Sequence, residues 1–153
     1  MAYSIVVGYD GSERSSKALD AAIDWAKTVA EGEIIIACAQ DRSGPAVGFT
    51  GVHGARMGVT AALTSMWDEL EKKIEGELAE AATRVKSAGV GVATACTPDR
   101  PDVTIINVAR DTSARLIVVG AKGAHAREGQ RTALGSTTNK VLHEAGGIPV
   151  LVV

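Results

Sequence analysis

The chain has 153 residues, of which 46% are hydrophobic and 22% are charged, and its formal net charge is −2 at pH 7. This length and composition predict one globular domain over residues 1–153, large enough to bury a core of its own. Acidic and basic residues are interspersed, which argues against a nucleic-acid groove and against a polybasic membrane anchor. The start of the chain lacks a basic segment and no apolar run is long enough to span a bilayer, so we expect no membrane association and a cytoplasmic location.

The first 39 residues predict a strand, a helix and a second strand. Tyr3 to Tyr9 form a near-continuous apolar run that ends in a polar turn, as in a buried strand. Ser12 is a favourable N-cap, and apolar residues then recur three and four positions apart up to Ala30, which indicates a helix. We expect Gly32 to end this helix as a C′ glycine and the second strand to occupy residues 34–39.

A glycine-rich segment and a long helix follow the second strand. Five glycines and Pro45 between residues 42 and 59 predict a loop, which at this length is typical of a lid, a binding loop or a disordered segment. The next helix is predicted over about residues 60–88 and is closed by Gly89. Its apolar stripe, which we expect to be core, consists of Leu63, Met66, Trp67, Leu70, Ile74, Leu78, Ala81 and Val85.

The second half of the chain alternates strands and helices in the same way. Residues 90–97 alternate enough in polarity to predict a strand near a sheet edge. Pro101 suits the first position of a helix, and the uniformly apolar residues 116–119 predict a central strand. The remaining predicted elements are a loop over residues 120–134, a helix over residues 137–144 and a final strand over residues 148–153.

This alternation predicts an α/β fold. Strands joined by helices imply right-handed crossovers, and therefore an open parallel sheet with helices on both faces. In such a sheet ligands bind beyond the carboxyl ends of the strands, at the point where the strand order reverses. Two strand ends carry polar, glycine-marked turns, at residues 8–12 and 120–123. If the strand order is 3-2-1-4-5, these two turns face one crevice.

The turn at residues 120–123 has the features of an anion site. Gly120 and Gly123 allow the backbone to approach a ligand closely. Residues 135–138, with the sequence Gly-Ser-Thr-Thr, open a helix whose N–H groups and dipole favour a negative charge. Phosphate is the natural ligand, although the same residues also suit an ordinary turn followed by a serine cap. Nearby positive charge comes from Lys122, Arg127 and Arg131.

Asp10 is the acidic residue at the other strand end. It either forms an Asx turn with Gly11 and Ser12 or contacts a base, a ribose or a metal ion. Neither a P-loop nor a dinucleotide fingerprint follows the first strand. The three histidines lack the spacing of metal ligands and no Ser-His-Asp set can be assigned, so we predict no metal site and no catalytic residues.

Cys38 and Cys96 both lie in apolar segments that are predicted to be strands. They lack the CxxC spacing of a redox or metal site, and a reducing cytosol disfavours a disulfide. We therefore expect both cysteines to be buried and to act as small hydrophobic residues.

Over essentially its whole length the chain resembles the universal stress protein family. The segments that carry the resemblance are Ile5-Val6-Val7-Gly8-Tyr9-Asp10-Gly11-Ser12, Leu116-Ile117-Val118-Val119-Gly120, the set Gly120, Gly123 and Gly135-Ser136, and Pro149-Val150-Leu151-Val152-Val153. The resemblance implies a Rossmann-like, five-stranded parallel sheet of order 3-2-1-4-5, similar to the adenine nucleotide alpha hydrolases. It also implies a homodimer formed through the C-terminal strand 148–153, and a regulatory role in the stress response with a protein partner that the sequence does not identify.

The resemblance implies an adenine nucleotide as the ligand. Relatives with the full glycine motif bind ATP and some relatives bind cyclic AMP, so we expect ATP, accompanied by Mg²⁺, with AMP or cyclic AMP as alternatives. Any ATP hydrolysis is expected to be slow, because no general base or water-positioning residue is assigned. The residues expected to contact the nucleotide are Gly8, Tyr9, Asp10, Ala39, Val119, Gly120, Lys122, Gly123, Gly135, Ser136 and Thr137.

The family pattern also implies which part of the nucleotide each of these residues contacts. Asp10 lies at the base and ribose, and Ala39 meets adenine through its backbone. The turn at residues 120–123, with Lys122, wraps the phosphates, and residues 135–137 cap them.

Two departures from the family pattern leave a different function open. The segment 124–134 is two residues longer than its counterpart in the family, and Asp99 replaces a glycine that borders the site in relatives. A carboxylate pointing inward at that place would repel phosphate. Both departures favour the alternative of a nucleotide-free interaction module that acts through its dimer surface and the 42–59 loop.

Overall fold

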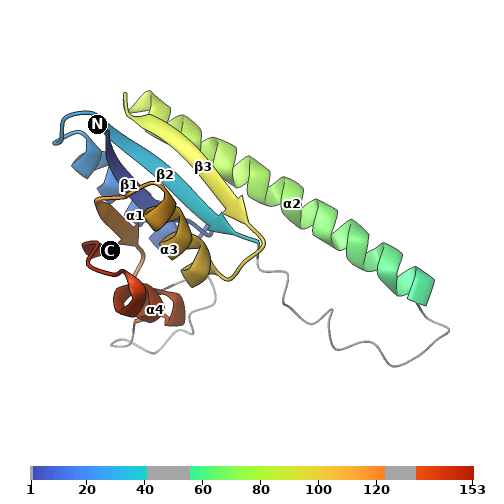
Figure 1. The fold of residues 1–153 in the computed structure, drawn as a ribbon. Helices are drawn as coiled ribbons and strands as arrows, with labels where there is room; N and C mark the ends of the chain where they lie inside the picture. The colour runs from blue at the N-terminus through green and yellow to red at the C-terminus, as the bar shows by residue number, and fades with distance from the viewer. Residues whose placement is uncertain (1, 41–55, 123–133) are drawn as a thin grey trace.

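The computed structural model of the chain describes residues 2–40, 56–122 and 134–153. The five strands in these ranges form one parallel sheet in the order β3-β2-β1-β4-β5 (Figure 1), which confirms the predicted fold class and strand order. The elements in chain order are β1 (Tyr3–Gly8), α1 (Glu13–Ala26), β2 (Gly32–Ala39), α2 (Arg56–Ser87), β3 (Gly91–Thr97), α3 (Pro101–Asp111), β4 (Leu116–Val119), α4 (Ser136–Glu144) and β5 (Val150–Val152).

Helices cover both faces of the sheet, as the sequence predicts. α1 and α2 lie on one face, and α3 and α4 lie on the other (Figure 1). Successive side chains of a strand point to opposite faces, so Ile5 and Val7 pack with α1 and α2, whereas Val6 packs with α3 and α4. All three side chains are completely buried. This burial on both sides explains why β1 is apolar without a break rather than alternating.

Two predicted helix ends are confirmed by their hydrogen bonds. Ser12 caps α1, because its Oγ accepts a hydrogen bond of 3.2 Å from the Ser15 N–H. Beyond α2, Gly89 has a left-handed φ of +78°. The Val90 N–H then donates to the Val85 carbonyl at 3.3 Å, as in a Schellman motif.

The end of α1 differs from the prediction. The helix stops at Ala26, with Lys27 as its C-cap, well before the predicted end at Ala30. Gly32 is the first residue of β2 rather than a C′ glycine, and the left-handed residue in this connection is Glu31, with a φ of +53°. A β-carbon on Gly32 would overlap the Ala26 carbonyl. Glycine is therefore required here by a close backbone contact and not by its dihedral angles.

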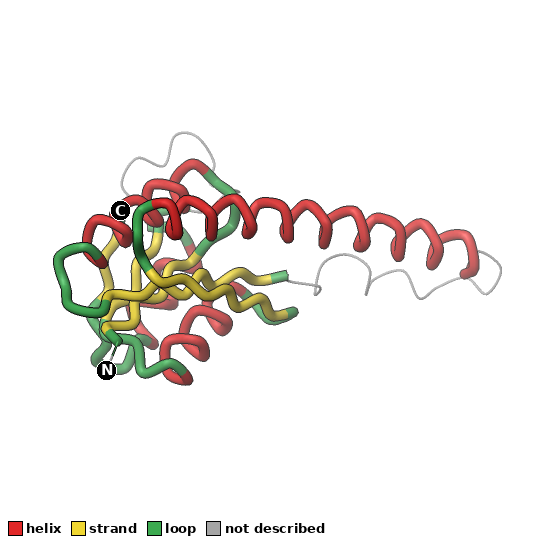
Figure 2. The backbone as a smooth tube through the Cα atoms, turned by 90° about the horizontal axis from the view of Figure 1, so that it is seen from above, coloured by secondary structure: helices red, strands yellow, loops and turns green. Residues whose placement is uncertain are grey.

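α2 starts earlier than predicted and ends close to the predicted position. It begins at Arg56, so residues 56–59 of the predicted loop are helical, and the rest of that loop lies outside the described residues. The 32 residues of α2 span about 48 Å at 1.5 Å per residue, whereas the 8 residues of β2 span about 26 Å. The first half of α2 therefore projects past the sheet, as Figures 1 and 2 show. No helix in the described ranges has a stretch both long and apolar enough to cross a membrane.

The apolar stripe of α2 is buried only where the helix covers the sheet. Leu78, Ala81 and Val85, in the second half of the helix, belong to the core. Met66 and Leu70, in the projecting half, are 54% and 41% exposed. The prediction that the whole stripe is core is therefore wrong, because none of the described strands lies beneath the projecting half.

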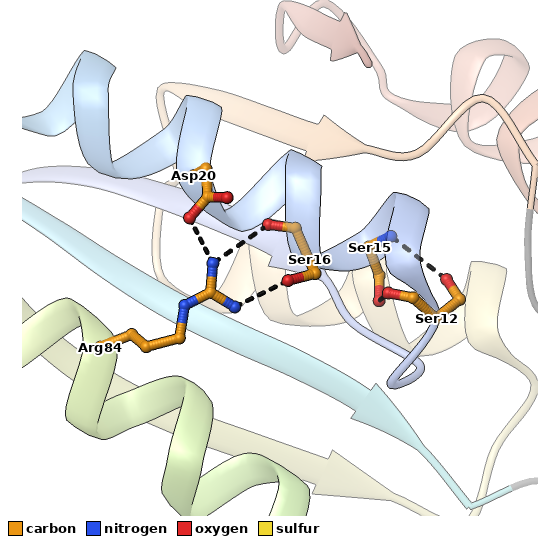
Figure 3. A network of polar contacts seen from close by, with 5 residues as sticks. All are labelled: Ser12, Ser15, Ser16, Asp20 and Arg84. Carbon is orange, nitrogen blue, oxygen red and sulfur yellow. Dashed lines mark hydrogen bonds and ion pairs between the residues drawn. The ribbon is translucent and has the colours of Figure 1, made fainter.

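Arg84 fastens α2 to α1 beside the core (Figure 3). Its guanidinium donates a hydrogen bond of 2.7 Å to the Ser16 Oγ and forms an ion pair with Asp20. A further, longer hydrogen bond of 3.5 Å reaches the Ser16 carbonyl. Because all of these partners lie in α1, the planar guanidinium fixes the two helices relative to each other.

The two cysteines differ in exposure. Cys38 in β2 is buried, as predicted, whereas Cys96 in β3 is exposed. β3 is an edge strand of the described sheet, so its side chains have a neighbouring strand on one side only. The prediction that Cys96 is buried is therefore wrong.

Candidate functional site

The turns after β1 and β4 lie at neighbouring strand ends. β1 pairs in parallel with β4, with Val7 opposite Val118, so the last residues of the two strands, Gly8 and Val119, lie at the same edge of the sheet. The chain runs from β1 outward through β2 to β3 and then returns to β4 on the other side of β1. The strand order thus reverses between β1 and β4, which is where open α/β sheets bind ligands.

The turn after β1 has the Asx geometry that the sequence predicts as one of two alternatives. The Asp10 Oδ1 accepts a hydrogen bond of 2.9 Å from the Ser12 N–H. Ser12 is held in turn by the Ser15 hydroxyl, which donates to the Ser12 carbonyl at 2.9 Å (Figure 3). The Asp10 side chain is exposed, so these bonds fix the direction of its carboxylate without burying it. Contact of Asp10 with a ligand stays a prediction.

A glutamate from α2 lies over the same turn. Gly11 has a φ of +76°, and a β-carbon on it would collide with the Glu77 carboxylate. The positive φ is what requires glycine here, since the end of the flexible Glu77 side chain could move aside for a β-carbon. The neighbouring Tyr9 packs against the core. Burial raises the pKa of its phenol, the Arg84 guanidinium opposes this, and nearby carboxylates add to the increase, so Tyr9 is neutral at physiological pH.

Gly120 brings the end of β4 against the first turn of α1. A β-carbon on Gly120 would lie 3.1 Å from the Arg14 Cβ and 3.2 Å from the Arg14 carbonyl carbon. Real β-carbons seldom have contacts this short, so a larger residue would push β4 and α1 apart. The close approach that glycine permits here is to the chain itself, which gives Gly120 a structural role independent of any ligand.

Two hydrogen bonds join the turn after β4 to the start of α4. The Thr138 hydroxyl donates to the Gly120 carbonyl at 2.7 Å. The Gly135 N–H donates to the Ala121 carbonyl at 2.8 Å. Thr138 is 3% exposed and Gly120 is half-buried, so this hydrogen bond is partly shielded from water. These bonds bring Gly120 and Gly135, two parts of the predicted glycine set, into one junction.

The first turn of α4 presents backbone N–H groups without a side-chain cap. Gly135 is the N-cap, and no side chain in the described ranges caps the helix with a hydrogen bond. Ser136 is exposed and Thr137 is half-buried. Lys122 directly follows Ala121, whose carbonyl is bonded to Gly135, so the Lys122 backbone lies close to this helix end. A helix N-terminus whose N-cap is glycine, with a lysine in the adjoining turn, is suited to the oxygen atoms of a phosphate.

The remaining predicted positions lie farther away or outside the described residues. Ala39 is the last residue of β2, and β1 separates it from Gly120. Asp99 is exposed and follows β3, with β2 between that strand and β1. Gly123 lies outside the described ranges, together with Arg127, Arg131 and all but the last residue of the segment 124–134. Within those ranges, no three His, Cys, Asp or Glu residues are grouped so as to hold a metal ion.

Three side chains of this region were not expected from the sequence. Arg14 and Glu77 occupy polar faces of their helices. A polar face predicts that a side chain is exposed to solvent, but it does not predict which turn at a strand end the side chain contacts. Thr138 has a detectable signal, because hydroxyl residues in the first turn of a helix often bond to nearby backbone. It is the last residue of the Gly-Ser-Thr-Thr sequence predicted to open this helix, although its bond to the end of β4 was not predicted.

The sequence profile of the Universal stress protein family matches residues 1–153. The chain belongs to this family. The point where the strand order reverses, between β1 and β4, with its glycine-marked turns, thus lies in a universal stress protein fold. Among proteins with curated functions, none matches the chain in sequence.

Solved structures of other universal stress proteins are similar in fold to this one. UspA from Lactobacillus plantarum is 22% identical with a TM-score of 0.76, over 100% of this chain and 99% of that chain. A universal stress protein in complex with cAMP is 27% identical with a TM-score of 0.64, over 100% of this chain and 98% of that chain. A universal stress protein from Archaeoglobus fulgidus in complex with dAMP is 17% identical with a TM-score of 0.65, over 99% of this chain and 97% of that chain.

Proposed function

We propose that this universal stress protein binds an adenine nucleotide where β1 and β4 end, and that nucleotide occupancy regulates its contact with a partner in the stress response. The observation that carries the proposal is the junction after β4. There, two hydrogen bonds hold the N-terminus of α4 against Gly120 and Ala121, the residues that directly precede Lys122. A helix end of this kind accommodates a phosphate. The relatives in complex with cAMP and dAMP support adenine as the base.

The proposed ligand is ATP with Mg²⁺, and AMP and cyclic AMP are the other candidates. In this proposal Asp10 contacts the ribose and base, and the Ala39 backbone meets adenine. Lys122 and the N–H groups at residues 135–137 hold the phosphates. No residue is proposed as a catalytic base, so ATP should be bound and released largely unhydrolysed.

The proposal is tested by the nucleotide content of the purified protein. Acid extraction should release material with the ultraviolet absorbance of adenine. Calorimetry of the emptied protein should then show saturable heat with ATP-Mg, AMP or cyclic AMP. Protein that carries no adenine and gives no heat with any of the three would contradict the proposal and favour a nucleotide-free interaction module.

Lys122→Ala should weaken ATP binding about fivefold, or about 1 kcal/mol, because one charge-assisted contact to phosphate is lost. Adenosine, which has no phosphate, should bind equally well to the variant and the wild type. Lys86→Ala is the matched control, since Lys86 lies in the last turn of α2, at the opposite end of the sheet, and should leave both affinities unchanged. Equal losses for ATP and adenosine would contradict the phosphate role of Lys122.

We propose further that two copies pair through β5. Among the described strands, β5 pairs only with β4. The Val153 N–H donates to the Val119 carbonyl and the Pro149 carbonyl accepts from the Ile117 N–H, so the odd-numbered residues face β4. Bonding groups alternate along a strand, and the Val152 N–H therefore points to the open edge. An open apolar edge favours pairing with a second strand.

Val152→Pro should convert the dimer to a monomer in analytical ultracentrifugation. Proline lacks the N–H that points to the open edge, and its introduction breaks no hydrogen bond to β4. Val152→Thr keeps that N–H and a β-branched side chain, so it should remain dimeric. A Val152→Pro protein that still sediments as a dimer would place the interface elsewhere.

A further inference from the structure

Cys38 and Cys96 lie side by side on neighbouring strands. β2 and β3 are parallel, and Cys38 is the register partner of Cys96. Neighbouring strands lie about 4.8 Å apart, a separation that a disulfide spans. Register partners point to the same face of a sheet, and Cys38 belongs to the core under α1 and α2. The two thiols are close enough to hydrogen-bond to each other.

A pocket gives one of these thiols access to solvent. It has a volume of about 290 Å³ and lies between α2 and the carboxyl ends of β2 and β3. Ile74 and Leu78 of α2 line it, as do Cys96 and Thr97 of β3. Cys96 is exposed, whereas Cys38 is buried. Small molecules from solvent can therefore reach Cys96 but not Cys38.

We propose that Cys38 and Cys96 form a redox-active dithiol that hydrogen peroxide oxidises to a disulfide between β2 and β3. The Cys96 thiolate attacks one peroxide oxygen, the O–O bond breaks, and hydroxide leaves and takes up the thiol proton as water. Cys96 is then a sulfenic acid. The Cys38 sulfur attacks the Cys96 sulfur, the S–O bond breaks, and the second hydroxide leaves with the Cys38 proton. Two thiols lose two electrons and two protons, and the peroxide becomes two waters.

The different surroundings of the two cysteines set the order of these steps. Burial raises the pKa of the Cys38 thiol to about 12, and the neighbouring Cys96 adds to this. Cys38 is therefore protonated at physiological pH and does not react with peroxide directly. It reacts once an electrophilic Cys96 sulfur lies beside it and the departing hydroxide takes its proton. Cys96 is the peroxide-reactive cysteine and Cys38 resolves it.

The charge of the pocket favours an uncharged oxidant. Glu71 and Glu75 of α2 line it together with Cys96, and their carboxylates repel an anionic disulfide such as oxidised glutathione. Hydrogen peroxide carries no charge and is small enough to enter. Cys96 is also the next-to-last residue of an edge strand, where the backbone has room to adjust as the disulfide forms.

The test is a titration of the full-length protein with hydrogen peroxide, followed by digestion and mass spectrometry without reductant. We expect a linked peptide pair that contains Cys38 and Cys96, with loss of both alkylatable thiols and full reversal by dithiothreitol. Oxidised glutathione at the same concentration should react roughly tenfold more slowly, because the pocket repels it. A linked peptide pair that forms equally fast with both oxidants would overturn the proposed selectivity for peroxide.

Cys38→Ser and Cys96→Ser are the matched variants. Cys38→Ser should accumulate a sulfenic acid on Cys96 that dimedone traps, and Cys96→Ser should keep Cys38 reduced. The proposed dithiol would be overturned if peroxide oxidises Cys96 in the wild-type protein while Cys38 can still be alkylated after unfolding. Two reduced thiols at peroxide concentrations that oxidise free cysteine would also overturn it. Neither readout depends on nucleotide binding.

Discussion

Replacing Gly32 with alanine is expected to lower the free energy of unfolding by about 3 kcal/mol. A β-carbon there would overlap three backbone atoms of Ala26, which cannot rotate out of the way as the end of a side chain would. To make room, β2 has to move away from the end of α1, although it is bonded to both β1 and β3. The strain therefore reaches the centre of the sheet. Urea denaturation followed by circular dichroism measures the loss.

Gly76→Ala is the matched control for this substitution. Gly76 is exposed within α2, and a β-carbon on it would meet no atom within 4 Å. Alanine is the better helix former, so this variant should gain about 1 kcal/mol. The same chemical change should thus act in opposite directions at the two sites. A Gly32→Ala protein as stable as the wild type would mean that the connection between α1 and β2 relaxes without cost.

Strand order and layering could be predicted because they follow from patterns that are local in the chain. Uninterrupted apolar strands separated by helices leave few topologies other than a doubly covered parallel sheet. Cap residues such as Ser12 and Gly89 act within a few positions of themselves, and both are confirmed. The strand order itself came from the resemblance of the glycine-marked segments to a known family.

The predictions that failed depend on contacts between distant parts of the chain. The helical pattern of α1 continues past Ala26, but the packing of Gly32 against that residue requires the turn to begin there. The stripe on α2 has one periodicity throughout, and only the length of the sheet decides that Met66 is exposed. Cys96 is in an apolar segment, yet its edge position exposes it. None of these neighbours can be read from spacing.

At the candidate site, too, the local features were predicted and the contacts between distant residues were not. The sequence identified the two turns, and the Asx turn at Asp10 is one of its two predicted alternatives. It did not identify the Glu77 carboxylate over Gly11, because a helix face that is polar does not reveal which strand end lies beneath it. It placed Thr138 at the start of the helix but did not predict the hydrogen bond by which this side chain joins β4 to α4.

Thr138→Val should lower the free energy of unfolding by about 2 kcal/mol and weaken nucleotide binding more than tenfold. Valine has nearly the same shape but no hydroxyl, so the Gly120 carbonyl loses its 2.7 Å hydrogen bond at a partly buried junction. The N-terminus of α4 is then no longer held in register with the turn after β4. Phosphates that contact both parts should lose their alignment. Chemical denaturation and ATP calorimetry measure the two effects.

Thr138→Ser separates the loss of stability from the loss of alignment. Serine keeps the hydroxyl and gives up one buried methyl group, which costs about 1 kcal/mol of stability. Because the bond to the Gly120 carbonyl is retained, ATP affinity should stay within about twofold of the wild type. A destabilised protein that still binds nucleotide, next to a valine variant that does not, would identify Thr138 as a positioning residue. If both variants lose affinity in proportion to their stability, the hydroxyl acts on the fold alone and the junction between β4 and α4 does not set the geometry of the site.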